Sequence, residues 1–203
     1  MKKIGILGGT FNPIHSMHIN IAKQAKKILT LDQIIFIPSA NPPHKCGEDI
    51  ESFCHRIKMV ELAIEGIQGF SVSNIENKIK HRKSYTVNTL KVLKLIYPKD
   101  KLYFIVGSDC VFDIEKWYRV EQIFKYCELV VLQRPDISDS KNLKTKIKEL
   151  ESRYNGKINL IGSITDNISS SEIRQKICLD SSEIDELDER ILNYIKQNNL
   201  YRN

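Results

Sequence analysis

Short apolar runs alternate with longer amphipathic segments along the whole chain. Six runs have the length and composition of buried strands, and they cover residues 4–7, 33–38, 70–75, 102–106, 129–132 and 158–161. Between and after them, apolar residues recur at helical spacing, which predicts helices over 17–29, 50–65, 85–97, about 140–152, 170–178 and 187–198. Strands that are apolar on both faces and separated by helices favour a mostly parallel sheet with helices covering each side.

The predicted fold class is therefore α/β, a Rossmann-like, doubly wound, mostly parallel sheet with helices on both faces. No linker rich in Gly, Ser or Pro, no low-complexity segment and no internal repeat interrupts the pattern. We expect one domain over residues 1–203, with a C-terminal helical segment at about 165–203. Ligands of such sheets bind beyond the carboxyl ends of the strands, so the segments that follow Leu7, Pro38, Val106 and Ile161 are the candidate site.

The segment after the first predicted strand reads GGTFNPIHSMH over residues 8–18. Its two glycines let the backbone approach a ligand closely, and the start of the following helix offers N–H groups and a positive dipole to an anion. His15 and His18 are three residues apart, so both fall on one side of the first helical turn. Two imidazoles in that place can donate hydrogen bonds to phosphate oxygens. A glycine turn followed by two surface histidines is the simpler interpretation.

The segment after the last predicted strand reads ISSSEIR over residues 168–174. Ser169 and Glu172 form a capping-box pattern, which by itself predicts only a well-capped helix. The same helix start can also bind an anion. Ser171 and Arg174 share one helical face, and a guanidinium forks readily onto a phosphate.

Together, the two segments resemble the GGTFDPxHxGH and ISSTxIR signatures of the nucleotidyltransferases whose hallmark is HxGH. The positions that match the first signature are Gly8, Gly9, Thr10, Phe11, Pro13, His15 and His18. Asn12 stands in place of the usual Asp, Met17 in place of the usual Gly, and Ser171 in place of Thr. The resemblance implies that the two histidines bind ATP phosphates and stabilise the transition state, while the second segment holds the β- and γ-phosphates.

Two middle segments carry further polar candidates, each with an ordinary structural alternative. The proline-rich segment 38–45 reads as a rigid loop, in which Lys45 either reaches a phosphate or is simply solvated. In the segment SYT, Ser84 or Thr86 can cap the next helix.

Two more candidates follow the strongest predicted strand. Asp109, in the turn GSD, either binds a ribose hydroxyl or caps a helix. Trp117 is the only tryptophan and lies in an amphipathic context, so it is equally well placed in the core.

The loop PPHK, the SYT and GSD segments, Trp117 and the C-terminal pair Leu200–Tyr201 together resemble the nicotinate-nucleotide adenylyltransferase branch of that superfamily. The resemblance covers the whole chain. It implies that Trp117 stacks on a pyridine ring and that backbone groups near Tyr85 and Thr86 receive the nicotinate carboxylate.

The residues that the resemblance implicates form three sets. The catalytic set is His15, His18, Lys45 and Arg174. The ATP-binding set is Gly8, Gly9, Thr10, Phe11, His18, Gly107, Asp109, Ile168, Ser170, Ser171 and Arg174. The substrate-binding set is Asn12, Lys45, Ser84, Tyr85, Thr86 and Trp117.

The implied reaction transfers AMP from ATP to nicotinate mononucleotide and gives deamido-NAD and pyrophosphate. Mg²⁺ is expected to be carried by ATP, without a dedicated protein metal site. Another acceptor, such as nicotinamide mononucleotide or phosphopantetheine, is the alternative, although the PPHK loop and the tryptophan argue against phosphopantetheine.

Composition narrows the class of protein. The chain has 41% hydrophobic and 28% charged residues, which is typical of a globular protein. A net charge of +6 suits anionic small substrates and also nucleic acid. The rival interpretation is a nucleic-acid-binding module that uses residues 78–101. Aromatic residues are not interleaved with the basic residues Lys78, Lys80, Arg82 and Lys83 of this segment, so we expect no nucleic-acid partner.

Cysteine use and hydropathy predict the compartment. The five cysteines are scattered without a CxxC pair, which is typical of reduced thiols in a cytosol. No apolar run approaches the ~18 residues that span a bilayer, and the apolar stretch after Lys3 is too short for a signal peptide. We therefore expect a cytoplasmic protein with no membrane partner. The sequence is compatible with a monomer and with a homo-oligomer. A zinc site at His44, Cys46, Cys54 and His55 is an alternative whose spacing matches no standard pattern.

Overall fold

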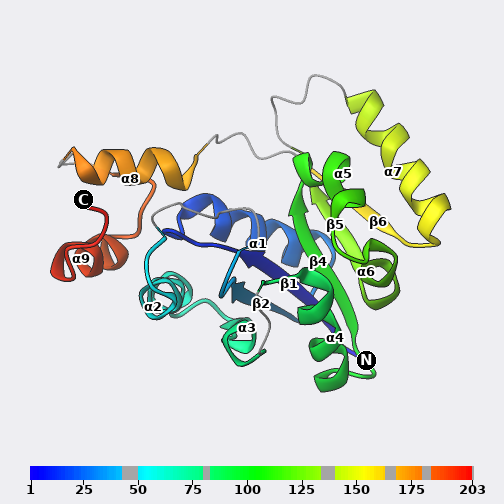
Figure 1. Cartoon of the computed structure of the whole chain (residues 1–203), viewed down its shortest axis with the longest axis horizontal. Coiled ribbons are helices and arrows are strands. Elements are labelled where there is room, and N and C mark those ends of the chain that lie inside the picture. Colours follow the sequence, from blue (N-terminus) through cyan, green and yellow to red (C-terminus); the bar gives the residue numbers. More distant parts are fainter. Residues whose placement is uncertain (43–49, 80–82, 134–139, 163–167, 180–183, 203) are drawn as a thin grey trace.

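The computed structural model describes residues 1–42, 50–79, 83–133, 140–162, 168–179 and 184–202. Within these ranges six strands form one sheet in the order β3-β2-β1-β4-β5-β6, and every neighbouring pair is parallel (Figure 1). The strands are β1 (Lys3–Gly9), β2 (Gln33–Pro38), β3 (Phe70–Val72), β4 (Lys101–Gly107), β5 (Glu128–Leu132) and β6 (Ile158–Ile161). The predicted α/β fold class is confirmed.

Helices cover both faces of the sheet. One hydrophobic cluster joins the sheet to α1 (Ser16–Ile28), α2 (Phe53–Ile64), α8 (Ser170–Cys178) and α9 (Glu189–Gln197). The opposite cluster joins it to α3 (Ile75–Lys78), α4 (Thr86–Ile96), α5 (Asp109–Asp113), the 3₁₀ helix η1 (Ile114–Lys116), α6 (Val120–Tyr126) and α7 (Ser140–Tyr154). The sheet is therefore buried on two sides, as a parallel sheet with crossover helices requires.

Alternation along the strands explains how one sheet serves two cores. Successive side chains of a strand point to opposite faces. In β2, Ile34 and Phe36 belong to the cluster under α1 and α2, whereas Ile35 and Ile37 belong to the opposite cluster. Because both faces are covered, both sets are apolar, and this produces the continuous apolar runs seen in the sequence.

The sequence prediction was wrong in three local respects. The strand expected over 70–75 ends at Val72, because residues 75–78 form the short helix α3. The helix expected from residue 50 begins at Phe53, after Ser52, whose side chain accepts a hydrogen bond from the N–H of His55. The short helices over residues 109–126 were not predicted, because elements of three to seven residues are too brief to display a helical period.

The strand order reverses between β1 and β4, since the chain moves outward from β1 to β2 and β3 and then returns to the other side of β1. Such a reversal leaves a crevice beyond the carboxyl ends of the two central strands. The C-terminal segment packs near this crevice, where the N–H of Ser16 donates to the carbonyl of Glu186 at 2.9 Å. No helix in the described ranges is both long and apolar enough to cross a membrane.

Candidate active site

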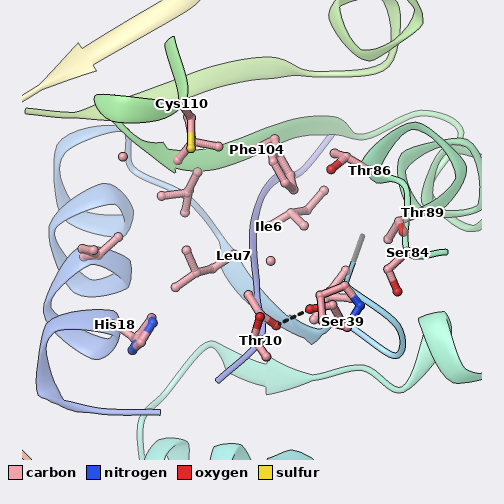
Figure 2. Close-up of a pocket in the computed structure, with 18 of the residues that line it drawn as sticks. Ile6, Leu7, Thr10, His18, Ser39, Ser84, Thr86, Thr89, Phe104 and Cys110 are labelled. Carbon is pink, nitrogen blue, oxygen red and sulfur yellow. Dashed lines mark hydrogen bonds between the residues drawn. The ribbon is translucent and has the colours of Figure 1, made fainter. Parts of the chain in front are cut away.

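A cavity of about 830 Å³ occupies the switch point of the sheet. Its floor includes residues from the ends of β1 and β4, and its walls come from the starts of α1, α4 and α8. Figure 2 shows His18 on one side of the cavity, Ser84 and Thr86 on the opposite side, and Leu7 between them. This volume lies in the usual range for a small-molecule site.

The two histidines meet at the start of α1. His15 is the N-cap residue, with an extended backbone, and is only 4% exposed. Its N–H donates to Nδ1 of His18 at 3.3 Å, and the two ring centroids are 3.9 Å apart. The ring of Phe11 packs edge-on against His18, with centroids 5.1 Å apart. The paired imidazoles therefore have a fixed orientation at the edge of the cavity.

The start of α8 closes onto the loop that precedes these histidines. The hydroxyl of Ser170 donates to the carbonyl of Pro13 at 3.0 Å. Arg174 donates through Nη1 to the carbonyl of Asn12 at 2.9 Å and through Nη2 to the hydroxyl of Ser171 at 3.3 Å. The two motifs, which lie at opposite ends of the sequence, thus form one wall of one cavity.

The predicted capping box of α8 is confirmed. The hydroxyl of Ser169 accepts the N–H of Glu172 at 3.2 Å, and the carboxylate of Glu172 accepts the N–H of Ser169 at 3.1 Å. Because Ser169 supplies the cap, the hydroxyls of Ser170 and Ser171 are not needed for it. Both of those residues line the cavity.

A short segment after β2 connects the two ends of the cavity. The N–H of Ser39 donates to the carbonyl of Gly9 at 2.8 Å, and the hydroxyl of Ser39 donates to the same carbonyl at 3.0 Å (Figure 2). Two residues later, the N–H of Asn41 donates to the hydroxyl of Ser84 at 2.9 Å, and the N–H of Ser84 donates back to the carbonyl of Asn41 at 2.8 Å. The loop near the histidines and the start of α4 are therefore held at a fixed separation.

Aromatic rings line the end of the cavity near α4. Trp117 is half-buried and packs edge-on against Phe104, with centroids 6.2 Å apart. Tyr85 and Tyr118 form a tilted pair at 4.7 Å. All four residues line the cavity, so a flat apolar ring bound here finds aromatic faces and edges. Trp117 also packs against the core, so its core role and its place at the site coexist.

Most of the residues selected from the sequence line this cavity. They are Gly8, Gly9, Thr10, His15, His18, Ser84, Tyr85, Thr86, Gly107, Trp117, Ile168, Ser170 and Ser171. Four others lie outside the lining: Phe11 is buried beneath the loop, Asn12 is 2% exposed, Asp109 is exposed at the start of α5, and Arg174 contacts the loop as described above. Lys45 falls outside the described residues.

Three alternatives from the sequence are also clarified. The N-cap residue of α4 is Tyr85 and makes no side-chain capping bond, so neither Ser84 nor Thr86 caps that helix. Met17, at the position of the family glycine, is 6% exposed and reaches the cavity lining. Of the four zinc candidates, His44 and Cys46 lie outside the described residues; Cys54 is exposed, and Nδ1 of His55 forms a 2.8 Å hydrogen bond with the hydroxyl of Tyr194.

Sequence reasoning missed a pair of polar residues near α4. Glu76 accepts the hydroxyl proton of Thr89 at 2.8 Å and the N–H of Ala40 at 3.2 Å, and both Glu76 and Thr89 line the cavity. No spacing in the sequence pairs them, because Glu76 belongs to the four-residue helix α3.

It also missed two supports of the loop. Tyr201 donates its hydroxyl proton to Oδ1 of Asn12 at 3.0 Å, and burial raises the pKa of Tyr201. Arg56 is 2% exposed, and desolvation lowers its pKa. Arg56 lies four residues before Val60 on the apolar stripe of α2, and a charged residue on that stripe is a signal that sequence reasoning can use.

The fold is a doubly wound parallel sheet. At its switch point, a loop with paired histidines at the start of one helix meets a second helix start that carries serines and an arginine. This combination of fold and site defines a nucleotidyltransferase. The sequence model of the cytidylyltransferase-like family matches residues 6–176, and the chain belongs to that family.

Comparison with individual relatives assigns the chain to a narrower family. It is 40% identical to a Clostridium kluyveri protein over 204 residues and 42% identical to a Clostridium tetani protein over 202 residues, and each comparison covers 100% of both chains. Both relatives are named "Probable nicotinate-nucleotide adenylyltransferase". The chain is a member of the nicotinate-nucleotide adenylyltransferase family.

A solved structure has the same fold. The Plasmodium falciparum nicotinic acid mononucleotide adenylyltransferase complexed with APC superposes with a TM-score of 0.77, over 99% of this chain and 98% of that one, at 21% identity. At this identity the likeness concerns the fold.

Proposed function

We propose that this protein transfers the AMP group of ATP to nicotinate mononucleotide, giving deamido-NAD and pyrophosphate, as one step of NAD biosynthesis. The observation that carries the proposal is that the HxxH loop and the SSSxxR helix start, which are remote in sequence, line one wall of a single cavity. Its opposite end is lined by Trp117, Tyr85 and Thr86. One end suits a triphosphate and the other a flat ring with a carboxylate.

The reaction follows from positioning and charge stabilisation. An oxygen of the mononucleotide's phosphate attacks the α-phosphorus of ATP, a new P–O–P bond forms, and the bond to the leaving pyrophosphate breaks. The attacking phosphate is already ionised at neutral pH, so neither a general base nor a covalent enzyme intermediate is required. His15 and His18 donate to the oxygens on which charge develops, and Arg174 with Ser170 and Ser171 receives the β- and γ-phosphates.

A divalent cation, in our proposal Mg²⁺, neutralises charge on the triphosphate when it is bound. No three His, Cys, Asp or Glu side chains within the described ranges gather as a metal site. The described part of the cavity wall offers hydroxyls, imidazoles and one carboxylate, that of Glu76, which already accepts from Ala40 and Thr89. This lining fits a cation that arrives on the nucleotide and keeps most of its waters. Lys45 is proposed to contact phosphate as a point charge.

The site residues are proposed to divide by position. Gly8, Gly9, Thr10, Gly107 and Ile168 are the wall for ATP; Ser84, Tyr85, Thr86 and Trp117 are the wall for the acceptor. Phe11 and Asn12 shape the loop from beneath, and Asp109 is proposed to reach the adenosine ribose. The whole chain acts as one nucleotidyltransferase domain with a C-terminal helical segment, and we expect it to act in the cytoplasm.

The decisive experiment supplies the purified protein with ATP, Mg²⁺ and one acceptor at a time. Nicotinate mononucleotide, nicotinamide mononucleotide and phosphopantetheine are compared, and the products are identified by mass spectrometry. We expect deamido-NAD and stoichiometric pyrophosphate with the acid. Preferential product formation with the amide or with phosphopantetheine would replace the proposed acceptor, and the absence of any adenylylated product would refute the chemistry.

A further inference from the structure

A buried arginine contacts the loop between β1 and α1, the loop that is proposed to bind the triphosphate. It has no part in the reaction proposed above. Arg56, on α2, is 2% exposed. Its Nη1 donates to the carbonyl of Thr10 at 2.7 Å, and its Nε donates to the carbonyl of Glu51 at 2.9 Å. Both contacts are to main-chain oxygens, and no carboxylate in the described part of the chain forms an ion pair with it. Its guanidinium also lies over the ring of Phe53, 5.6 Å from the centroid. A buried charge whose hydrogen bonds go only to carbonyls is costly, which is a reason to look for its use.

The contact with Thr10 fixes the orientation of one peptide unit. The C=O and N–H groups of a trans peptide point in opposite directions. Because the Thr10 carbonyl is directed at Arg56, the N–H of Phe11 is directed away from Arg56. Thr10 itself lines the cavity, so this peptide unit lies next to the proposed triphosphate site.

The same peptide unit leads into a strained residue. Phe11 has φ of 50°, in the left-handed region that bulky side chains rarely adopt. Such a conformation persists only where the surroundings hold it in place. Arg56 holds the loop at the residue before Phe11, while Arg174 and Ser170 hold the carbonyls of the two residues after it.

The charge of Arg56 lies behind a loop whose residue Thr10 lines the cavity. A guanidinium does not lose its proton in a protein, so the charge is present at every working pH. A buried charge is screened less than a surface charge, and its attraction for a nearby polyanion is correspondingly larger.

We infer that Arg56 is a positioning residue for the triphosphate: it orients the Thr10–Phe11 peptide toward the phosphates and adds a buried positive charge behind the loop. This inference rests on the proposed ATP-dependent function. It predicts a selective loss of affinity for ATP when Arg56 is replaced, because the acceptor binds at the far end of the cavity.

The experiment compares Arg56→Met and Arg56→Lys with Leu150→Ala. Leu150 is 0% exposed, lies in the opposite core cluster and does not line the cavity, so Leu150→Ala controls for general destabilisation. ATP affinity is measured by calorimetry without an acceptor, KM for both substrates by steady-state kinetics, and folding by thermal unfolding. All binding is measured well below each midpoint of unfolding.

We expect Arg56→Met to weaken ATP binding by about tenfold or more, the scale of one hydrogen bond to a charged group. Arg56→Lys keeps the charge but cannot reach both carbonyls, so its ATP affinity should lie between those of Arg56→Met and the wild type. In both variants the KM for the mononucleotide should stay near the wild-type value. Leu150→Ala should lower the unfolding midpoint and leave ATP affinity unchanged.

Wild-type ATP affinity in Arg56→Lys and Arg56→Met would overturn the inference. So would equal losses for both substrates, or a loss in Leu150→Ala as large as that in the arginine variants. If Arg56→Met does not fold, Arg56→Lys decides alone, by the same criterion. Failure of the wild-type protein to adenylylate nicotinate mononucleotide would refute the proposed function instead, while the calorimetric comparison would still test Arg56.

Discussion

The guanidinium of Arg174 donates a hydrogen bond of 2.9 Å to the carbonyl of Asn12, although 162 positions separate the two residues. This contact joins the helix start of α8 to the loop that leads to His15 and His18. Two imidazoles and the serines of the α8 start, from opposite ends of the chain, therefore border the same cavity, and Arg174 ties the two segments together from outside the lining. The proposed chemistry depends on that convergence, and the predictions below test its parts.

Replacement of His18 by Ala should lower kcat by at least about 100-fold, the usual effect of losing a donor to the transition state. His55→Ala is the matched control, because His55 pairs with Tyr194 and does not line the cavity. Steady-state kinetics with ATP and nicotinate mononucleotide provides the measurement. Near-normal turnover of His18→Ala would remove this residue from the mechanism.

Replacement of Trp117 by Ala should raise the KM for nicotinate mononucleotide and leave the KM for ATP little changed. The reason is that Trp117 lines the aromatic end of the cavity, away from the histidines. Trp117→Phe keeps an aromatic face, so it should bind nicotinate mononucleotide more tightly than Trp117→Ala does, by about 1 kcal/mol. Equal losses for both substrates would instead indicate that Trp117 serves mainly the core.

Arg174→Lys should raise the KM for ATP by about tenfold or more, since an ammonium cannot replace the guanidinium that bonds Asn12 and Ser171 and is proposed to bind a phosphate. Arg190 offers a comparison, because it pairs with Asp188 and Glu65 away from the cavity. Arg190→Lys should leave both KM values unchanged. A similar ATP affinity in the two lysine variants would contradict the role of Arg174.

Glu128 should make stability depend on acid pH. Burial by itself raises the pKa of its carboxyl, but hydrogen bonds from Lys101 and Asn159, with the charges of Lys101 and Lys157, hold the pKa below its ordinary value of 4.5. A lowered folded-state pKa stabilises the protein above pH 4.5, and this stabilisation is lost as the pH falls through the folded value.

The measurement is urea unfolding of the wild type and of Glu128→Gln between pH 7 and pH 3. At neutral pH the wild type should be more stable by about 1 kcal/mol, a modest figure because Lys101 is partly exposed. The difference should shrink toward zero in acid. A difference that does not change with pH would show that the ionised carboxylate is not its source.

The Cys127 thiol should resist alkylation in the folded protein. Burial raises its pKa to about 12, and the thiol donates to the carbonyl of Ile123 at 3.4 Å, so little thiolate forms at pH 8. Cys54 and Cys178 are exposed and should react with iodoacetamide under the same conditions. Peptide mass spectrometry distinguishes the sites, and urea should make Cys127 reactive. Rapid labelling of Cys127 in native protein would contradict its burial.

Local patterns carried much of the fold prediction. Each of the six predicted strands is present in the structure, because a strand that is buried on both faces appears in the sequence as a continuous apolar run. The capping box of Ser169 and Glu172 was also predictable, since all its atoms lie within four residues. Strand ends then indicated which segments to compare, and two of these carry the nucleotidyltransferase signatures.

Other parts of the site have no local signature. The helices of residues 109–126 are too short to show a period, and the pairings of Glu76 with Thr89 and of Asn12 with Tyr201 join segments that sequence spacing does not relate. Arg56 is visible only as a charge on an apolar stripe, and its partner Thr10 is not indicated at all.

The sequence by itself determined the class of fold, the two signature motifs and the branch of the family, because periodicity, capping and motif spacing are properties of consecutive residues. Only the tertiary structure decided that both motifs share one cavity and that a buried arginine and a C-terminal tyrosine support the loop between them. Those relationships depend on the order of strands in the sheet and on the packing of α2 and the C-terminal segment against it. Burial and hydrogen bonding between remote segments exist only once the chain has folded.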